Sequence, residues 1–228
     1  MAIYYIDPVL AAAAIIPAVV LLIKVYKADR LEKEPVSLIL SLVFFGVLST
    51  AIAMVLEQVG TAVLGNYLPE GSVAYNAVLY FGIVAFSEEG AKYLLLKKRT
   101  WWDINFNCQF DGVVYGVSVS LGFALWENLG YVAMYGFGTA LVRAVTAVPG
   151  HACFGVFRGD HAENEQRDQK PRRFLFQPVG TVDLDQQYHR RDHRRGDQHG
   201  IHFAYGRQHS VSLSLTSCFF LLYSFSFL

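Results

Sequence analysis

Two adjacent carboxylates and an amine, Glu88, Glu89 and Lys92, lie inside an otherwise apolar run that extends from residue 72 to residue 96. A run of roughly 25 residues is long enough to cross a bilayer as a helix. A charged carboxylate near the middle of a bilayer costs on the order of 3 kcal/mol on insertion scales. Packing does not explain two such groups, because leucine would pack better at the same positions. The sequence therefore predicts a functional site that faces a polar cavity.

The spacing of these three residues fits one helix. Lys92 follows Glu88 by four residues and Glu89 by three, so its amine can reach either carboxylate. Consecutive residues are about 100° apart around a helix axis, so we expect the two carboxylates to point at different places. One would face the cavity as a base or ligand, and the other would orient it or pair with Lys92. The alternative is a plain Glu–Lys pair near a helix end. Such a pair needs only one glutamate, so it leaves the second glutamate unexplained.

Two later apolar segments carry polar groups at a similar depth. Glu127 is followed by Asn128 in one segment, and His151 follows Pro149 and Gly150 in the next. At about 1.5 Å of rise per residue, the first glutamate pair, Glu127 and His151 all fall near the membrane midplane. We therefore expect them to line one cavity. Taken singly, Glu127 with Asn128 is also compatible with an interhelical clamp, and His151 with a hydrogen bond between helices.

Carboxylates and an imidazole at one depth favour hydrolysis. Glu88 or Glu89 would activate a water molecule, and His151 would stabilise the developing oxyanion or act as a ligand. Three neighbouring side chains would hold the site in place, namely Lys92, Glu127 and Asn128. The cofactor is left open: Glu88, Glu89 and His151 are the ligands if a divalent metal such as zinc is present, although zinc sites usually contain more histidine. A non-enzymatic transporter that relays protons through the same carboxylates is the alternative function.

The elements that must position these side chains are transmembrane helices. The chain has 228 residues, of which 54% are hydrophobic, and its formal net charge of zero gives no bulk attraction to nucleic acid. Apolar runs of about 20 residues recur and predict an all-α, polytopic transmembrane helical bundle with at least five spans. The predicted spans cover residues 9–26, 36–56, 72–96, 112–134 and 137–157.

Basic residues fall in alternate loops, after the first, third and fifth predicted spans. The positive-inside rule places those loops in the cytoplasm and the N-terminus outside. Arg143 lies near one end of the fifth predicted span, and we expect its side chain to snorkel to the outer interface. We expect three glycines of the fourth span to be close-packing positions, namely Gly112, Gly116 and Gly122.

The chain changes character at Arg158. Residues 1–157 are apolar and interspersed with glycine, whereas residues 158–210 are rich in glutamine, histidine, arginine and aspartate and have no helical or strand period. One interpretation is a disordered basic tail that ends in an apolar anchor, residues 211–228. The other, which we favour, is that the reading frame shifts near codon 158. The sequence thus divides into a helical bundle (1–157) and an atypical tail (158–228).

Four short motifs occur in order along the predicted spans. They are Glu88-Glu89-x-x-Lys92, Phe110-Asp111-Gly112 with Tyr115-Gly116, Phe123-x-x-x-Glu127-Asn128 and Pro149-Gly150-His151-Ala152. A first loop from Asp29 to Pro35 accompanies them. Together the motifs resemble those of the PrsW intramembrane proteases, a branch of the group that includes CAAX-prenyl endopeptidases and bacteriocin-immunity proteins. The resemblance covers residues 1–157.

The resemblance implies that Glu88, Glu89 and His151 are catalytic and that the bundle lies in the plasma membrane. It also implies that the protein acts, in the lipid bilayer, on a transmembrane protein substrate such as an anti-sigma factor. The family has further spans with a second histidine, and the residues after Phe157 offer no credible counterpart. An inactive interaction or immunity protein is therefore a third alternative, and the activity of this form is left open.

Overall fold

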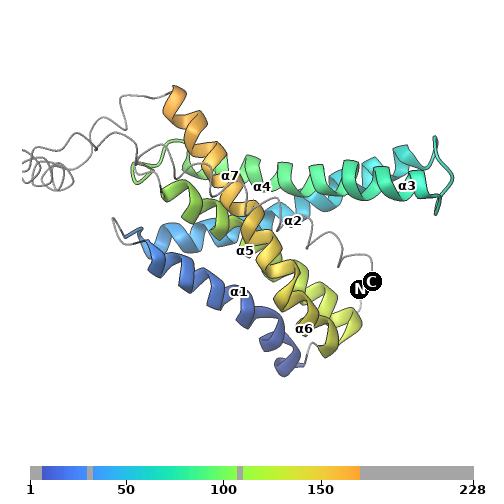
Figure 1. Ribbon diagram of the computed structural model, residues 1–228, viewed down its shortest axis with the longest axis horizontal. Helices are drawn as coiled ribbons and strands as arrows, with labels where there is room; N and C mark the ends of the chain where they lie inside the picture. Colours follow the sequence, from blue (N-terminus) through green and yellow to red (C-terminus); the bar gives the residue numbers. More distant parts are fainter. Residues whose placement is uncertain (1–6, 30–32, 107–109, 170–228) are drawn as a thin grey trace, which may run out of the picture. The chain divides into compact units, whose positions relative to one another are not determined.

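The computed structural model describes residues 7–29, 33–106 and 110–169, and every element within these ranges is helical. Figure 1 shows the helices along the chain. They are α1 (Pro8–Ala28), α2 (Val36–Leu64), α3 (Val73–Ala77), the π-helical segment η1 (Val78–Val84), α4 (Ala85–Thr100), α5 (Asp111–Tyr135), α6 (Phe137–Val145) and α7 (Ala147–Gln169). The predicted all-α class is confirmed.

Local sequence signals explain where two of the helices begin. Asp7 accepts a hydrogen bond from the Val9 amide at 2.7 Å, and Pro8 occupies the first helical position, where its missing N–H costs little. Ser72 caps α3 in the same way through the Tyr75 amide, at 3.1 Å. Because α3, η1 and α4 follow one another without a gap in the chain, the predicted third span is helical.

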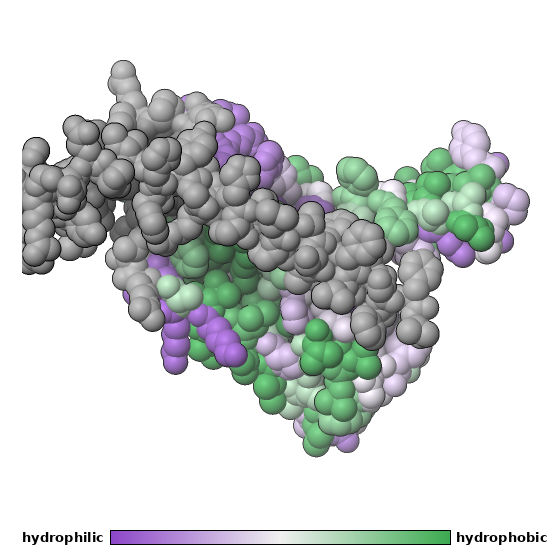
Figure 2. Space-filling view, in the orientation of Figure 1, coloured by the Kyte–Doolittle hydropathy of each residue, from purple (hydrophilic) through white to green (hydrophobic). Residues whose placement is uncertain are grey.

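Three of the described helical stretches are long and apolar enough to cross a membrane, namely Pro8–Ala28, Val36–Leu64 and Phe137–Gln166. No more than 39% of the apolar window in any of them is buried inside the structure. Large apolar side chains such as Val20 and Phe44 remain exposed, and Figure 2 shows hydrophobic residues, in green, at the surface of the part that is not drawn in grey. Lipid, unlike water, accommodates such a surface at no cost. The chain is a membrane protein built as a helical bundle.

Helix α5 is central to the packing and contacts α1, α2, α6 and α7. Glycines permit its closest approaches. A Cβ at Gly116 would lie 2.8 Å from the Gly159 nitrogen on α7, and a Cβ at Gly46 on α2 would lie 3.0 Å from the Cα of Gly122. A third glycine of α5, Gly112, also meets α7. The prediction that the glycines of this span are close-packing positions is confirmed.

Helix α2 is longer than predicted. It continues past the expected end at Leu56 to Leu64, so Glu57 lies within a helix rather than in a loop. Packing against the following segment accounts for the extension. Gly60 lies so close to η1 that a Cβ there would be 2.5 Å from Ile83 Cγ2.

The fifth predicted span is two helices rather than one. Helices α6 and α7 are separated at Thr146, and α7 continues past the expected end at Phe157 to Gln169. Pro149 falls in the first turn of α7, where a proline is tolerated because the amide at that position has no acceptor within the helix. The helix break therefore lies just before the Pro149-Gly150 pair.

Candidate active site

Lys92 on α4 is the centre of a buried cluster of ionisable side chains. Its Nζ donates to Glu88 Oε2 at 3.0 Å and to Glu89 Oε1 at 2.8 Å, and it lies 3.3 Å from His151 Nδ1 on α7. The lysine side chain is 0% exposed. Its ammonium also lies 3.8 Å from the centroid of the Phe123 ring, a cation–π contact. A buried ammonium is costly unless it is paired, and these contacts supply the pairing.

Glu127 on α5 contacts the imidazole from its other side. Glu127 Oε2 lies 2.9 Å from His151 Nε2 and accepts a hydrogen bond from Arg143 Nη2 at 2.8 Å. Arg143 on α6 also donates to Asn128 Oδ1 at 2.7 Å, and Asn128 Nδ2 donates to the Ala14 carbonyl oxygen on α1 at 3.4 Å. The predicted snorkelling of Arg143 is wrong, because two acceptors inside the bundle draw its guanidinium inward.

Arg158 on α7 adds a second cation beside Lys92. It donates to Glu89 Oε2 through one nitrogen and to Ser120 Oγ, at 2.8 Å, through another, and its side chain is 5% exposed. Both carboxylate oxygens of Glu89 therefore have cationic partners. Glu88, by contrast, uses one oxygen for Lys92, and its Oε1 has no hydrogen-bond partner in the part of the chain that the structure describes.

The expectation that Glu88 and Glu89 point at different places is wrong. Their ligand atoms and that of His151 all lie within 4.8 Å of one another. The angle of about 100° separates the two Cα–Cβ bonds, but each side chain has three rotatable bonds and both turn toward one ammonium. The expectation that these groups and Glu127 converge is confirmed, because His151 bridges Lys92 and Glu127.

The same three side chains form the one group in the described ranges whose ligand atoms are close enough for a metal ion, namely Glu88, Glu89 and His151. Two carboxylate oxygens and an imidazole nitrogen are donors that suit zinc and related divalent metals. The Lys92 ammonium lies within reach of all three donors, so this position already attracts positive charge. The residues fit a metal by chemical type and by place, on the condition that the ammonium moves aside.

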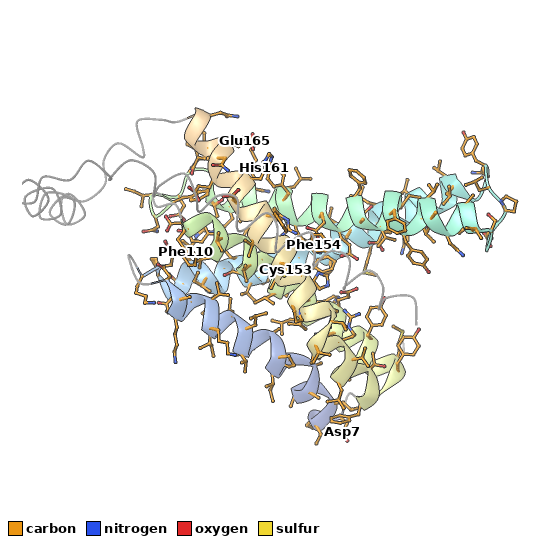
Figure 3. The ribbon with its side chains drawn as sticks, in the orientation of Figure 1. Asp7, Phe110, Cys153, Phe154, His161 and Glu165 are labelled. Carbon is orange, nitrogen blue, oxygen red and sulfur yellow. The ribbon has the colours of Figure 1, made fainter. Side chains whose placement is uncertain are left out.

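A separate set of contacts ties the C-terminal half of α7 to α4. Glu165 accepts hydrogen bonds from Lys97 Nζ, at 2.6 Å, and from the Tyr93 hydroxyl. The His161 ring packs against Tyr93 with 5.8 Å between centroids, and Figure 3 shows His161 and Glu165 on the same half of α7. His161 and Glu165 belong to the predicted atypical tail, residues 158–228.

Three further charged side chains lie in or beside the cluster although the sequence did not predict them to belong to it, namely Glu57, Arg143 and Arg158. Glu57 interacts electrostatically with Glu88, Glu127 and Lys92. The available signal was the one that identified Glu88, an isolated charge within an apolar helix. It was obscured because each of the three residues lies near a limit of a predicted span, where charges are expected.

Apolar membrane helices that enclose paired carboxylates and an imidazole fit an intramembrane hydrolase, and they also fit a transporter that relays protons. Residues 34–181 match the family described as PrsW family intramembrane metalloprotease. The chain belongs to this family, as the motifs predicted, and is accordingly an intramembrane protease. The match extends beyond Phe157, the expected end of the resemblance.

Several relatives are named Protease PrsW. The one from Geobacillus kaustophilus is 36% identical over 167 residues, which are 73% of this chain and 71% of the relative. The one from Halalkalibacterium halodurans is 33% identical over 175 residues, 75% of this chain and 78% of the relative. The one from Bacillus subtilis is 35% identical over 148 residues, 65% of each chain. No solved structure gives a significant match.

Proposed function

We propose that this protein hydrolyses a peptide bond of a transmembrane protein, such as an anti-sigma factor, within or beside the bilayer. Its catalytic residues are Glu88, Glu89 and His151. The observation that supports the proposal most directly is the approach of two carboxylates and an imidazole, from two helices, to one buried cation. Three side chains support the site, namely Lys92, Glu127 and Asn128.

The two glutamates have different parts in the proposed reaction. Glu88 has a free oxygen and is the proton acceptor: water attacks the carbonyl carbon of the scissile bond, and Glu88 takes a proton from that water. When the C–N bond breaks, the same proton passes to the amine nitrogen, which leaves as a neutral amine. In the site without a metal, Glu89, whose two oxygens contact Lys92 and Arg158, keeps the ammonium in place.

The role of His151 follows from its partners. The Glu127 carboxylate accepts a hydrogen bond from Nε2–H, and in the neutral imidazole this leaves the lone pair on Nδ1. In this tautomer Nδ1 accepts a hydrogen bond from Lys92 or binds a metal, and it does not donate to an oxyanion. We therefore favour the ligand or acceptor role for His151 and assign oxyanion stabilisation to the Lys92 ammonium.

A divalent metal such as zinc is the proposed cofactor, because the family is described as metalloproteases. Glu88, Glu89 and His151 would hold it. When bound, such an ion polarises a carbonyl group or a water molecule. Glu127 would keep the imidazole nitrogen directed at the metal, as carboxylates do behind many histidine ligands.

A cleavage assay on the full-length protein in nanodiscs tests the proposal. Glu88→Gln, Glu89→Gln and His151→Ala should each reduce kcat/KM for a transmembrane reporter by at least about 10²-fold, the usual effect of losing a general base. Glu70→Gln, on the exposed loop after α2, is the matched control and should leave the rate unchanged. A chelator should abolish cleavage and zinc should restore it. Full activity in all three variants would overturn the assignment, and chelator-resistant cleavage would remove the metal.

We also propose that the bundle lies in the plasma membrane with its N-terminus outside and its first, third and fifth loops in the cytoplasm. The supporting observation is the alternation of basic residues between loops. A single cysteine introduced at Lys27 and modified by a membrane-impermeant reagent tests the orientation. Protection in intact cells and labelling after permeabilisation are expected, and labelling in intact cells would invert the topology.

The atypical tail, residues 158–228, remains a proposal of its own. We propose that its reading frame is shifted, because aliphatic residues become rare across residues 158–210 without a linker signal, although α7 and the family match both continue past codon 158. Sequencing the gene across codon 158 tests this idea. An uninterrupted and reproducible frame would remove it.

A further inference from the structure

Glu57 on α2 is a fourth carboxylate beside the cluster, and it has no role in the proposed reaction. It is half-buried and interacts electrostatically with Glu88, Glu127 and Lys92. Within the described ranges, no hydrogen bond or ion pair is made by its side chain. The other three carboxylates of the cluster all have such partners.

The packing of α2 places Glu57 at the level of the catalytic glutamates. One turn before it, Ala53 packs in a cluster that contains Ala91 of α4. Three residues after it, Gly60 lies against Ile83 of η1. These two contacts show that the helices run antiparallel, and residues three and four apart share a helix face. Glu57 therefore faces the stretch between Ile83 and Ala91, which contains Glu88.

The charges of the cluster balance without Glu57. Three carboxylates meet three basic side chains through direct ion pairs, namely Glu88, Glu89 and Glu127 with Lys92, Arg143 and Arg158. Glu57 adds one acidic group that no described base compensates. An unpaired carboxylate at membrane depth is unfavourable, and the usual explanation of such a residue is a ligand or pathway for charge.

A bound metal ion does not supply the missing partner directly. The ligand atoms within 4.8 Å of one another belong to Glu88, Glu89 and His151, and Glu57 is not among them. The helix surface next to Glu57 opens instead toward the apolar exterior: Met54 is 53% exposed and Val55 is 60% exposed. A segment of a membrane protein can therefore approach this carboxylate from the side of the lipid.

We propose that Glu57 is a substrate-binding residue that pairs with a cationic side chain, lysine or arginine, close to the scissile bond. The inference rests on the proposed function, since it concerns the substrate of the same site, and it narrows that substrate to a membrane segment with a positive charge. Lysine and arginine suit this position because their long apolar stems extend through lipid while the charged group reaches a polar partner.

Binding of a matched set of peptides tests the inference independently of cleavage. The probes are fluorescent transmembrane peptides of polyleucine-type sequence that carry lysine, acetyl-lysine or glutamate at one position, and this position is moved along the peptide in steps of one residue. Acetylation removes the charge of lysine and preserves its stem. Affinity is measured by energy transfer to the full-length protein in nanodiscs, with cleavage recorded in parallel.

We expect wild type to bind the lysine peptide about tenfold more tightly than the acetyl-lysine peptide at one or two adjacent positions, a difference of about 1.4 kcal/mol. Glu57→Gln, which preserves shape, should bring this ratio to about one, and Glu57→Lys should reverse the preference toward the glutamate peptide. Glu70→Gln removes the same charge from the exposed loop after α2 and should leave the ratio unchanged.

A ratio near one in wild type at every position would overturn the inference. A lysine preference that survives in Glu57→Gln would also overturn it, and weaker zinc binding in that variant would then indicate that Glu57 acts on the metal instead. Charge-dependent binding without cleavage of any peptide would support Glu57 as a binding residue and contradict the proposed protease mechanism, so the two failures are distinguishable.

Discussion

Lys92 neutralises two carboxylates that lie at membrane depth, and this is the central fact at the scale of residues. Its ammonium is within hydrogen-bonding distance of both glutamates and close to the imidazole, and it has no exposure to solvent. Arg158 and Arg143 complete the pairing on either side. Each member of such a network depends on the others, because an unpaired buried charge is far more costly than a missing surface pair.

Replacing Lys92 by methionine should destabilise the protein by about 3–5 kcal/mol, because Glu88 and Glu89 lose their shared cation. Added zinc should recover part of the loss by binding at the same three donors. The measurement is thermal unfolding in nanodiscs with and without zinc.

Lys97→Met is the matched control for this variant. The same change on the same helix removes a pair with Glu165 whose side chains are 34% and 26% exposed, and such pairs contribute about 0–1 kcal/mol. Equal destabilisation of the two variants, or a Lys92→Met protein that zinc does not stabilise, would contradict the shared position of ammonium and metal.

At the scale of elements, the site depends on how closely α7 approaches α5. Gly112 and Gly116 on α5 meet Gly155 and Gly159 on α7 with the backbones almost in contact. This approach brings His151, near the beginning of α7, to Glu127, and Arg158, further along α7, to Glu89. Small residues at a helix crossing permit such an approach in a membrane, where van der Waals packing replaces the hydrophobic effect.

Gly116→Ala should therefore separate α5 from α7, since its Cβ would lie 2.8 Å from the Gly159 nitrogen. We expect a loss of stability of about 1–3 kcal/mol, the usual effect of overpacking, and a lower kcat. Gly130→Ala on the same helix is the control, because a Cβ there meets nothing within 4 Å. Thermal unfolding and reporter cleavage measure both effects, and a harmless Gly116→Ala would show that the helices have room to separate.

A second element-scale contact joins the loop between α1 and α2 to the start of α5. The Tyr115 hydroxyl donates to Glu34 Oε2 at 2.6 Å, and Asp111 and Asp29 are also buried, at 2% and 3% exposure. Burial, reinforced by these two carboxylates, outweighs the hydrogen bond from Tyr115 and raises the pKa of Glu34 to about 8. Two of the sequence motifs, the first loop and the start of the fourth span, thus meet at one acidic contact.

This contact predicts a pH dependence of stability. Glu34 keeps its proton in the folded protein up to about pH 8, whereas the unfolded chain releases it near the ordinary value of 4.5. The stabilisation is complete below pH 4.5 and is lost as the pH rises through about 8. Glu34→Gln should flatten the decline in the thermal unfolding midpoint between about pH 5 and pH 9, while Glu70→Gln should not. An unchanged slope in Glu34→Gln would show that another group titrates.

At the scale of the whole molecule, the length of α7 determines how many contacts hold the bundle together. Its first half carries His151, and its second half contributes Arg158, Gly159 and Glu165 to contacts with α4 and α5. Residues 1–171 form one compact unit. The described part of the chain thus includes residues on both sides of the change in composition at Arg158.

A chain that ends after Phe157 should unfold at a lower midpoint than a chain that ends after residue 169. The shorter chain loses the Arg158–Glu89 and Lys97–Glu165 pairs, and we expect its midpoint to fall on the order of 10 °C. Size-exclusion thermostability measurements on both chains test this. Equal midpoints would show that the second half of α7 contributes nothing to the bundle.

The sequence by itself determined the class of the protein and the catalytic candidates. Isolated charges in apolar runs are unfavourable in lipid, so the type and depth of Glu88, Glu89, Glu127 and His151 were sufficient to predict a shared site. Glycines within a membrane helix were likewise sufficient to predict close packing. Both inferences depend on local composition and on the length of the apolar runs relative to the thickness of a bilayer. A single sequence contains this composition and these lengths.

Only the tertiary structure decided which charge meets which. Side-chain rotation brought Glu88 and Glu89 to one ammonium, although their positions on the helix predicted divergence. Arg143 turned inward because acceptors from another helix lie there, and Glu57 joined the site because α2 continues beyond its apolar run. Such pairings depend on the crossing of helices distant in the chain, and one-dimensional hydropathy has no information about those crossings.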